Sequence, residues 1–133
     1  MLTVKRNVPP VDYSKANQII TVFHAEGLAG PSPVFSQRVI NYAFFDFRKN
    51  QDVNRTGQTE TNGFLLVIPR LKNGLLAQPI YPGDKVIIGE HSAVDTREKW
   101  AALIPSKVPN MAVVKYVDPK YWRAEIAHWE AGG

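Results

Sequence analysis

The sequence predicts a mainly β protein, a small β-barrel with one short α-helix. The apolar runs are short and rich in β-branched and aromatic residues, ten prolines and nine glycines separate them, and only one segment has helix signals. A chain of 133 residues suits one domain that buries about two thirds of its unfolded surface. We expect an extended N-terminal arm over residues 1–15 and a single barrel domain over residues 16–133.

The first third of the chain predicts the arm and two strands. Two adjacent prolines at 9–10 impose an extended path and remove two backbone donors, which is typical of an arm. Residues 18–25 read as the first strand, and residues 34–47 as a second, long strand with a bulge near Phe45. The residues whose alternation suggests one face of that strand are Ile40, Tyr42, Phe44 and, less regularly, Phe47.

A long polar run, KNQDVNRTGQTETN at 49–62, separates the second strand from a third at 63–69. We expect this run to be an inter-strand loop, and ordered loops of such length tend to be functional. Its only basic residues are Lys49 and Arg55, which suits water or a weak contact with a polyanion better than tight phosphate binding. The alternative is an extended hairpin tip that has no role.

The middle of the chain carries turn signals and one short strand. Residues 70–79 form a loop with a turn at Asn73-Gly74. A sharp turn at Pro82-Gly83-Asp84 leads into a strand at 85–88, a pattern frequent in small β-barrels. In this barrel turn the acidic residue can bond its own backbone.

The last third predicts the helix, a strand and an ambiguous tail. A helix over 96–104 has Asp95 as its cap, with Glu98 in a capping-box position. A strand follows at 111–117. The closing segment YWRAEIAHWEAGG has spacings that fit either a helix or a final strand.

Signals for chemistry are absent. The chain has no cysteine, and its three histidines (His24, His91 and His128) lie in unrelated segments without metal-ligand spacing. No serine stands in a G-x-S-x-G elbow, and the glycines form no phosphate-binding loop. Pairs of carboxylates such as Asp46 and Asp52 lie among basic residues and fit solvated charge better than acid–base work. We therefore expect no enzymatic activity, catalytic residue, metal or cofactor.

Charge and hydropathy limit the kinds of partner that the chain can bind. Residues 1–72 hold nine basic and five acidic residues, while residues 73–133 hold seven of each. A basic half could face DNA or an acidic protein, but a solvated surface with a mild bias is the favoured interpretation. Because no apolar run reaches membrane-spanning length and the N-terminus lacks a signal-peptide core, we expect a soluble chain made in the cytoplasm, with no membrane contact.

Aromatic residues gather near the end of the chain, where Trp122 and Trp129 flank His128. In a monomer they would cap the core. In an assembly they would be anchors of a ring or neighbour interface, because such side chains bury much area at low entropic cost. The sequence leaves both interpretations open.

Several stretches, in this order and spacing, resemble the minor capsid proteins of long-tailed phages of Gram-positive bacteria. These are head-completion proteins, also called head-to-tail connectors or stoppers. The stretches are NYAFFDFRKNQDVNRTG at 41–57, LLVIP at 65–69, PGDKVIIG at 82–89, VVKYVD at 113–118 and HWEAGG at 128–133.

The resemblance implies a non-catalytic virion protein of the head–tail neck. It would form a homo-oligomeric ring, commonly of twelve copies, below the portal-bound adaptor and above a tail terminator or tail protein. Packaged double-stranded DNA would pass through the lumen without sequence-specific binding. The polar run would reach into the channel as a gating loop. The residues expected to form that loop are Lys49, Asn50, Gln51, Asp52, Asn54, Arg55, Thr56, Gly57 and Gln58.

Two other functions compete with this interpretation. A tail terminator or adaptor ring protein would have more helix than the sequence provides. A barrel-type module that binds single-stranded nucleic acid would need exposed aromatics interleaved with basic residues. The only candidate for that is the run 42–47 with Arg38, Arg48 and Lys49.

Overall fold

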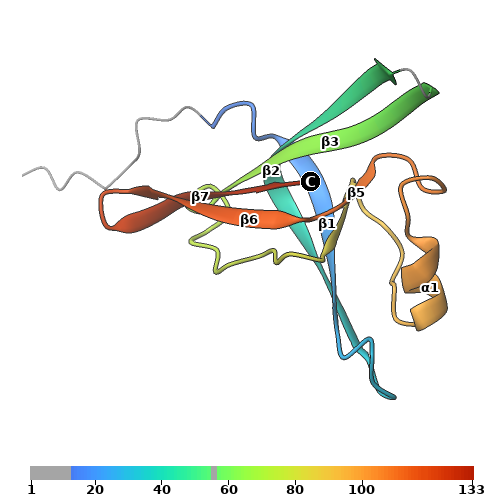
Figure 1. Cartoon of the computed structure of the whole chain (residues 1–133). Coiled ribbons are helices and arrows are strands. Elements are labelled where there is room, and N and C mark those ends of the chain that lie inside the picture. The colour runs from blue at the N-terminus through green and yellow to red at the C-terminus, as the bar shows by residue number, and fades with distance from the viewer. Residues whose placement is uncertain (1–12, 55–56) are drawn as a thin grey trace, which may run out of the picture.

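The computed structural model describes residues 13–54 and 57–133, and antiparallel strands dominate it (Figure 1). The prediction of a mainly β protein with one short helix is therefore confirmed. The elements in chain order are β1 (Gln18–Glu26), β2 (Val34–Asn54), β3 (Gly57–Pro69), β4 (Lys85–Ile88), α1 (Arg97–Ala102), β5 (Met111–Val113), β6 (Tyr116–Trp122) and β7 (Glu125–Gly132).

The strands form one sheet in the order β5-β4-β1-β2-β3-β7-β6. The long strand β2 belongs to both halves of this sheet. Its first part, from Val34 to Ala43, pairs with β1, and its second part, from Phe44 to Asn54, pairs with β3. A single strand thus changes partner half-way along its length and links the two halves.

Strands β5 and β6, at the two opposite edges of the sheet, follow one another directly in the sequence. Strands β5 and β6 are separated only by Val114 and Lys115. In the described part of the chain no ladder joins β5 to β6, so the sheet is open and the hydrogen-bonded closure of a barrel is not present. Val114 fixes the junction, since its N–H donates to the Asp84 carbonyl (2.8 Å) and its carbonyl accepts from Gly83 N–H (2.7 Å).

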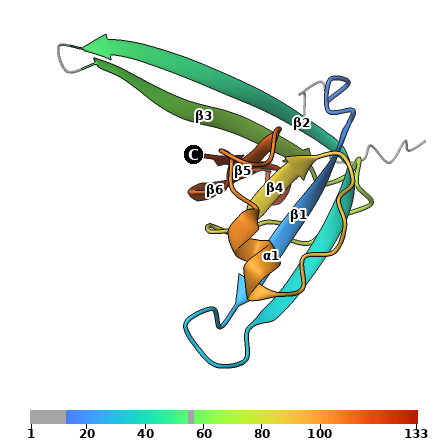
Figure 2. The same cartoon turned by 90° about the vertical axis from the view of Figure 1, so that its right-hand side faces the viewer.

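The main core lies on the inner face of the bent sheet and draws on both halves. Fourteen buried residues make up this cluster, among them Ile20 of β1, Leu66 of β3 and Trp129 of β7. A smaller cluster around Phe23 and Leu103 packs on the other face of the β1–β4–β5 half, beneath α1 and its flanking loops. Figure 2 shows α1 lying over β1 and β4.

The helix is shorter than expected and begins at a different cap. Thr96, rather than Asp95, is the N-cap, and its hydroxyl accepts from Lys99 N–H at 3.1 Å. Asp95 instead pairs with the Lys99 ammonium at 3.0 Å. Threonine is also a strong N-cap residue, so capping chemistry predicted the helix start to within one residue.

The bulge in β2 lies earlier than expected. The register slips between the pairs Gln18↔Ala43 and Ile20↔Ile40, whereas Phe45 sits in a regular ladder. Because an extra residue reverses which side chains face the core, the predicted alternation is wrong beyond Ile40. Ile40, Ala43 and Phe45 are buried, and Tyr42 is exposed.

The side chain of Asn73 holds the bulge in place. Its amide donates to the Tyr42 carbonyl (2.8 Å) and to the Pro69 carbonyl (2.7 Å), and its oxygen accepts from Tyr42 N–H (3.2 Å). The predicted turn here is present, with Gly74 N–H bonded to the Leu71 carbonyl at 3.0 Å. A turn residue thus replaces the strand partner that the bulge removes from Tyr42.

The predictions for the two ends of the chain have different outcomes. The final segment is a strand, β7, paired with both β3 and β6. Residues 1–12 of the expected arm lie outside the described residues. Tyr13 is packed against the body, where it accepts from Ala16 N–H in a turn (2.9 Å).

Candidate functional site

The paired ends of β2 and β3 extend beyond the rest of the sheet as a two-stranded finger, residues 48–62 (Figures 1 and 2). The register runs without interruption from Phe44↔Val67 to Asn54↔Gly57. Strand β7 pairs with β3 only from Leu65 onward, so among the described residues the strands of the finger pair only with each other. Six paired residues on each side, from Lys49 to Asn54, give it a length of about 20 Å.

The expected gating loop is therefore a hairpin, and that part of the sequence-based prediction is wrong. Of the residues expected to form it, Lys49, Asn50, Gln51, Asp52 and Asn54 lie in β2, and Gly57 and Gln58 lie in β3. Arg55 and Thr56 are outside the described residues. Asparagine, glutamine and aspartate have low β propensity, so composition concealed the strands. The available signal was length, because a fourteen-residue loop without structure is uncommon.

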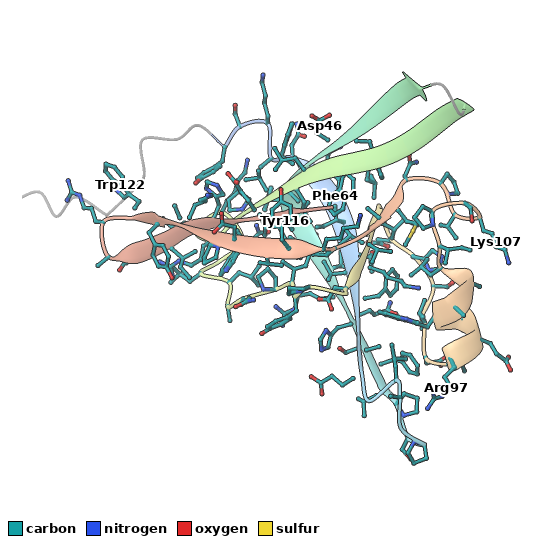
Figure 3. The ribbon with its side chains drawn as sticks, in the orientation of Figure 1. Asp46, Phe64, Arg97, Lys107, Tyr116 and Trp122 are labelled. Carbon is teal, nitrogen blue, oxygen red and sulfur yellow. The ribbon has the colours of Figure 1, made fainter. Side chains whose placement is uncertain are left out.

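Three phenylalanines form the base of the finger. The ring of Phe45 lies 4.5 Å from that of Phe47 and is stacked on that of Phe64 at 5.4 Å, centroid to centroid. Phe47 and Phe64 are directly paired across the two strands. Figure 3 shows Phe64 and Tyr116 close together below the finger and Asp46 at its root. The finger thus leaves the body from an aromatic clamp.

The C-terminal glycines fit closely against this base. A Cβ on Gly133 would lie 2.9 Å from the Val113 carbonyl oxygen and 3.0 Å from the Phe64 ring, and one on Gly132 would clash with the Tyr116 ring. Only residues without a side chain fit here unless the neighbours move. The end of β7 therefore closes on both β5 and the finger base.

The aromatic tail divides between core and surface. Trp129 is 2% exposed and belongs to the main core, so its side chain is not available as a surface anchor in the single chain, and the core interpretation holds for it. Trp122 is half-buried and lies at the far end of the β6–β7 hairpin, away from the finger (Figure 3). Arg123 stands over its ring at 5.5 Å.

His128, the third residue of that predicted interface, anchors the start of the described chain. Its Nδ1 lies 2.6 Å from the Tyr13 hydroxyl, and its Nε2 lies 3.2 Å from Oε1 of Glu130. Burial, together with the nearby charge of Glu130, raises the pKa of Tyr13 above its ordinary value. Tyr13 is also fixed by Lys72, whose ammonium donates to its carbonyl at 3.0 Å.

The predicted barrel turn is present and holds a titratable pair. Asp84 N–H donates to the Tyr81 carbonyl (3.1 Å), Tyr81 N–H donates to the Asp84 carboxylate (2.9 Å), and Gly83 has φ +91° as this turn requires. Sequence reasoning missed that His24 Nδ1 lies 2.5 Å from the same carboxylate. Because β1 and the turn are 60 residues apart, no local spacing could have indicated this contact.

Burial and the hydrogen bond between His24 and Asp84 shift the pKa of each of these two groups in opposite directions. The bond to Asp84 is the main cause that raises the pKa of His24, opposed by burial and aided by Glu26. Burial raises the pKa of Asp84, and the bond to His24 opposes that rise. The two groups line a cavity of about 200 Å³ with Ser36, Arg38 and Tyr81. Ser36 lies opposite His24 in the ladder but makes no hydrogen bond to it.

Searches for other kinds of site and for known relatives were negative. Among the side chains of residues 13–47 and 63–133, no group of three or more acidic or histidine residues is arranged to hold a metal ion. The helix in that part of the chain is too short to cross a membrane. No family model, curated protein or solved structure matches the sequence or the fold.

Proposed function

We propose that this chain is a ring-forming structural protein of a phage head–tail neck, a stopper whose finger enters the DNA channel. The observation that carries the proposal is the finger, a polar hairpin about 20 Å long that projects from an apolar base. Copies arranged in a ring would bring these hairpins together at the axis and narrow the lumen. The resemblance of the sequence to head-completion proteins points to the same role.

The composition of the finger suits a gate that DNA must pass. Residues 49–62 contain two basic residues, Lys49 and Arg55, and two acidic residues, Asp52 and Glu60, so their net charge is zero. A tight grip on a duplex requires a dense array of basic side chains, which would also slow passage of DNA. A neutral polar hairpin can obstruct a channel sterically without binding what moves through it.

The base of the finger supports a mechanical role. The stacked rings of Phe45 and Phe64 and the close contact of Gly133 join the hairpin to the rigid part of the sheet. A tail protein or adaptor that displaced the body would therefore displace the finger with it. This coupling is what a gate controlled from outside the channel needs.

The features of a nucleic-acid-binding module are weak. Such a module would display a row of exposed aromatic rings beside basic groups. In the 42–47 stretch, Phe45 is 5% exposed, and the Tyr42 ring already lies beneath Lys72, with its centroid 5.1 Å from the ammonium. We expect weak or undetectable DNA binding in a salt titration, and tight salt-dependent binding would favour this rival.

The proposal is tested first by location and then by the finger. Gold-labelled antibodies should decorate only the neck of particles whose heads and tails have been separated. A variant in which residues 49–62 are replaced by Asn-Gly should still assemble on heads, and those heads should lose their DNA.

A matched control keeps the length of the finger and changes its chemistry. Serine at Asn50, Gln51 and Gln58 preserves a polar hairpin of the same reach, so heads carrying this variant should retain DNA. Full DNA retention by the shortened variant would refute the gating role, and label along the tail or on no particle would refute the neck assignment.

A further inference from the structure

An apolar groove of about 560 Å³ lies beside the base of the finger. The finger base lines it with Phe47 and Phe64, and the segment between α1 and β5 lines it with Pro105, Val108 and Pro109. Phe47 is 37% exposed, and both prolines are exposed, so the groove is open to a partner from outside. Its volume lies in the range of sites that take a ligand or a peptide segment.

The groove contains one charged side chain among its described lining residues, that of Lys115. The Lys115 ammonium makes no hydrogen bond or ion pair with any side chain or backbone group that the structure describes. An apolar groove with one unpaired cation is complementary to an apolar segment that carries one carboxylate.

Residues 27–34, the turn between β1 and β2 together with the first residue of β2, form an apolar tip that projects from the body (Figures 1 and 2). Their sequence, GLAGPSPV, contains no charged residue and a single hydroxyl group. Leu28 is 37% exposed and Val34 is 63% exposed. Apolar side chains gathered on a projecting, solvent-exposed turn are typical of an interaction site.

The tip is held in one conformation before any partner binds. The guanidinium of Arg97, at the start of α1, donates to the Leu28 and Gly30 carbonyls. Gly30 N–H donates to the Gly27 carbonyl at 3.0 Å, and the two prolines of the tip fix their own φ angles. A segment that is already ordered loses little conformational entropy when it docks.

The carboxylate next to the tip matches the cation of the groove. Glu26 is directly paired with Val34 across β1 and β2, and its side chain is 74% exposed. One oxygen contacts Nε2 of His24 at 3.1 Å, and a carboxylate has acceptor sites for further donors. The tip and Glu26 together present apolar side chains and one negative charge, which is the complement of the groove.

The tip and the groove lie far apart along β2. Val34 begins this strand, and Phe47 lies thirteen residues further on, about 40 Å along the strand. In both views the tip lies at the lower end of the molecule and the finger at the upper end (Figures 1 and 2). Because the tip is also fixed to α1, it cannot reach the groove of its own chain. Two complementary surfaces at separate places on one chain can meet only between copies.

We propose that the tip of one copy occupies the groove of the next copy, with Glu26 opposite Lys115. The contact is heterologous, because one surface meets a different surface of the neighbour, and repeated contacts of this kind close into a ring when the rotation allows it. Since Phe47 and Phe64 line the groove, the neighbour's tip would also brace the base of the finger. The proposal rests on the proposed function, because it supplies the subunit contact of the ring.

The absence of cysteine from the chain permits a direct test by cross-linking. One preparation carries Ser32→Cys in the tip, another carries Pro109→Cys in the groove and a larger affinity tag, and the two are mixed under oxidising conditions. A disulfide forms only where the Cα atoms come within about 7 Å, and the tag gives the mixed dimer a mass of its own. We expect this dimer at a yield at least roughly tenfold above that with Tyr121→Cys, an exposed position on β6.

Charge reversal tests the pairing of Glu26 with Lys115 in the same assay. Glu26→Lys on the tip copy, or Lys115→Glu on the groove copy, should lower the yield of the mixed dimer by about two- to fivefold, as expected of an exposed ion pair. Reversing both charges should restore the yield, because the two side chains again attract each other. A loss that the second reversal did not restore would overturn this pairing.

Further outcomes separate the contact from the proposed function. Pro105→Cys reads the groove at a second exposed position, in case Pro109→Cys does not fold. Equal linking to Tyr121→Cys, or no linking at either groove position, overturns the proposal. Label at the phage neck without tip–groove links would overturn this contact and leave the proposed function intact. Links without label at the neck would support the contact and overturn the proposed function.

Discussion

Strands β2 and β3 pass through two regions that are held by different forces. In the body, their inward side chains Phe45, Leu66 and Ile68 are at most 5% exposed, and each contributes about 1.5–3 kcal/mol by leaving water. In the finger, the same ladder continues through six more residues on each side but joins no other strand of the part of the chain that the structure describes. A lone two-stranded hairpin is marginal in water, so the finger depends on the body for its anchorage.

The difference indicates which region is maintained for folding and which for function. Burial explains the apolar residues of the body that make up its core, although other apolar residues, such as Val34 (63% exposed) and Leu75 (62%), lie on the surface. The finger has only one large apolar residue, Val53, among residues 49–62, and burial cannot account for its length. A long projection that adds little to stability is expected where a protein needs to reach something.

The largest effect should come from the centre of the body. Trp129→Ala removes a 2% exposed ring from the main core, and such truncations cost about 3–5 kcal/mol. Trp122→Ala, at a half-buried position on the β6–β7 hairpin, should cost less than about 1 kcal/mol. Urea unfolding of the isolated chain measures both. Equal, small losses would mean that Trp129 is not a core residue and would revive its assignment to an interface.

A smaller loss is expected at the bulge, where the body turns from one half of the sheet to the other. Asn73→Ala deletes three hydrogen bonds to backbone groups of Tyr42 and Pro69, each worth about 0.5–1.5 kcal/mol net. We expect a loss of about 1–3 kcal/mol in thermal or urea unfolding. Asn41→Ala is the matched control, because this exposed asparagine sits in the same bulge without such bonds, and it should change little. If both variants lost the same stability, the bulge would not depend on Asn73.

The body was largely predictable from the sequence because its signals are local. The β-branched run at 85–88 and the turn residues Pro82, Gly83 and Asp84 specify a strand and its entry within a few residues of each other, and both are observed. The strand–helix ambiguity of the last segment could not be resolved locally. Its inward residues, such as Trp129 and Ala131, are defined by pairing with β3, about 60 residues away.

The finger and the candidate contacts around it were not predictable for a related reason. Its strands are stabilised by cross-strand pairing, which propensity does not register, so Asn50 and Asp52 read as loop residues. The position of the bulge, which reversed the expected face of Tyr42, depends on an amide from a distant turn. The His24–Asp84 contact likewise exists only after β1 and the turn have been brought together.

That contact should produce a modest pH dependence. His24 has a pKa raised above 6.5, mainly by its bond to Asp84. A histidine whose folded pKa exceeds its unfolded value stabilises the fold most below the unfolded pKa, and this contribution is lost as pH rises through the folded pKa. Between about pH 6 and 8, the stability difference between wild type and His24→Asn should therefore shrink as pH increases, by less than about 1 kcal/mol because the side chain is 31% exposed.

Unfolding curves over that pH range measure the effect, and His91→Asn provides the control. The Nδ1–H of His91 donates to the neighbouring Ser92 carbonyl (2.8 Å), and the ring lies edge-on against Phe23, so His91→Asn removes a histidine that has no carboxylate partner among the described residues. A difference for His24→Asn that stayed constant with pH would show that the ring acts by packing against Tyr81 rather than by titration.

The smallest change in stability is expected from the largest deletion. Replacing residues 49–62 with Asn-Gly joins the paired residues Arg48 and Gly63 through a two-residue turn suited to a hairpin. The aromatic clamp at Phe45 and Phe64 and the pairing of β3 with β7 are retained, so the free energy of unfolding should change by less than about 1 kcal/mol in urea. A loss of more than about 3 kcal/mol, comparable to that of a buried core side chain, would mean that the finger supports the body. The distinction between finger and body would then fail. A finger required for folding would be explained by stability, and its length would not indicate a function. If this variant kept its stability while phage heads carrying it lost their DNA, the finger would be explained by function alone.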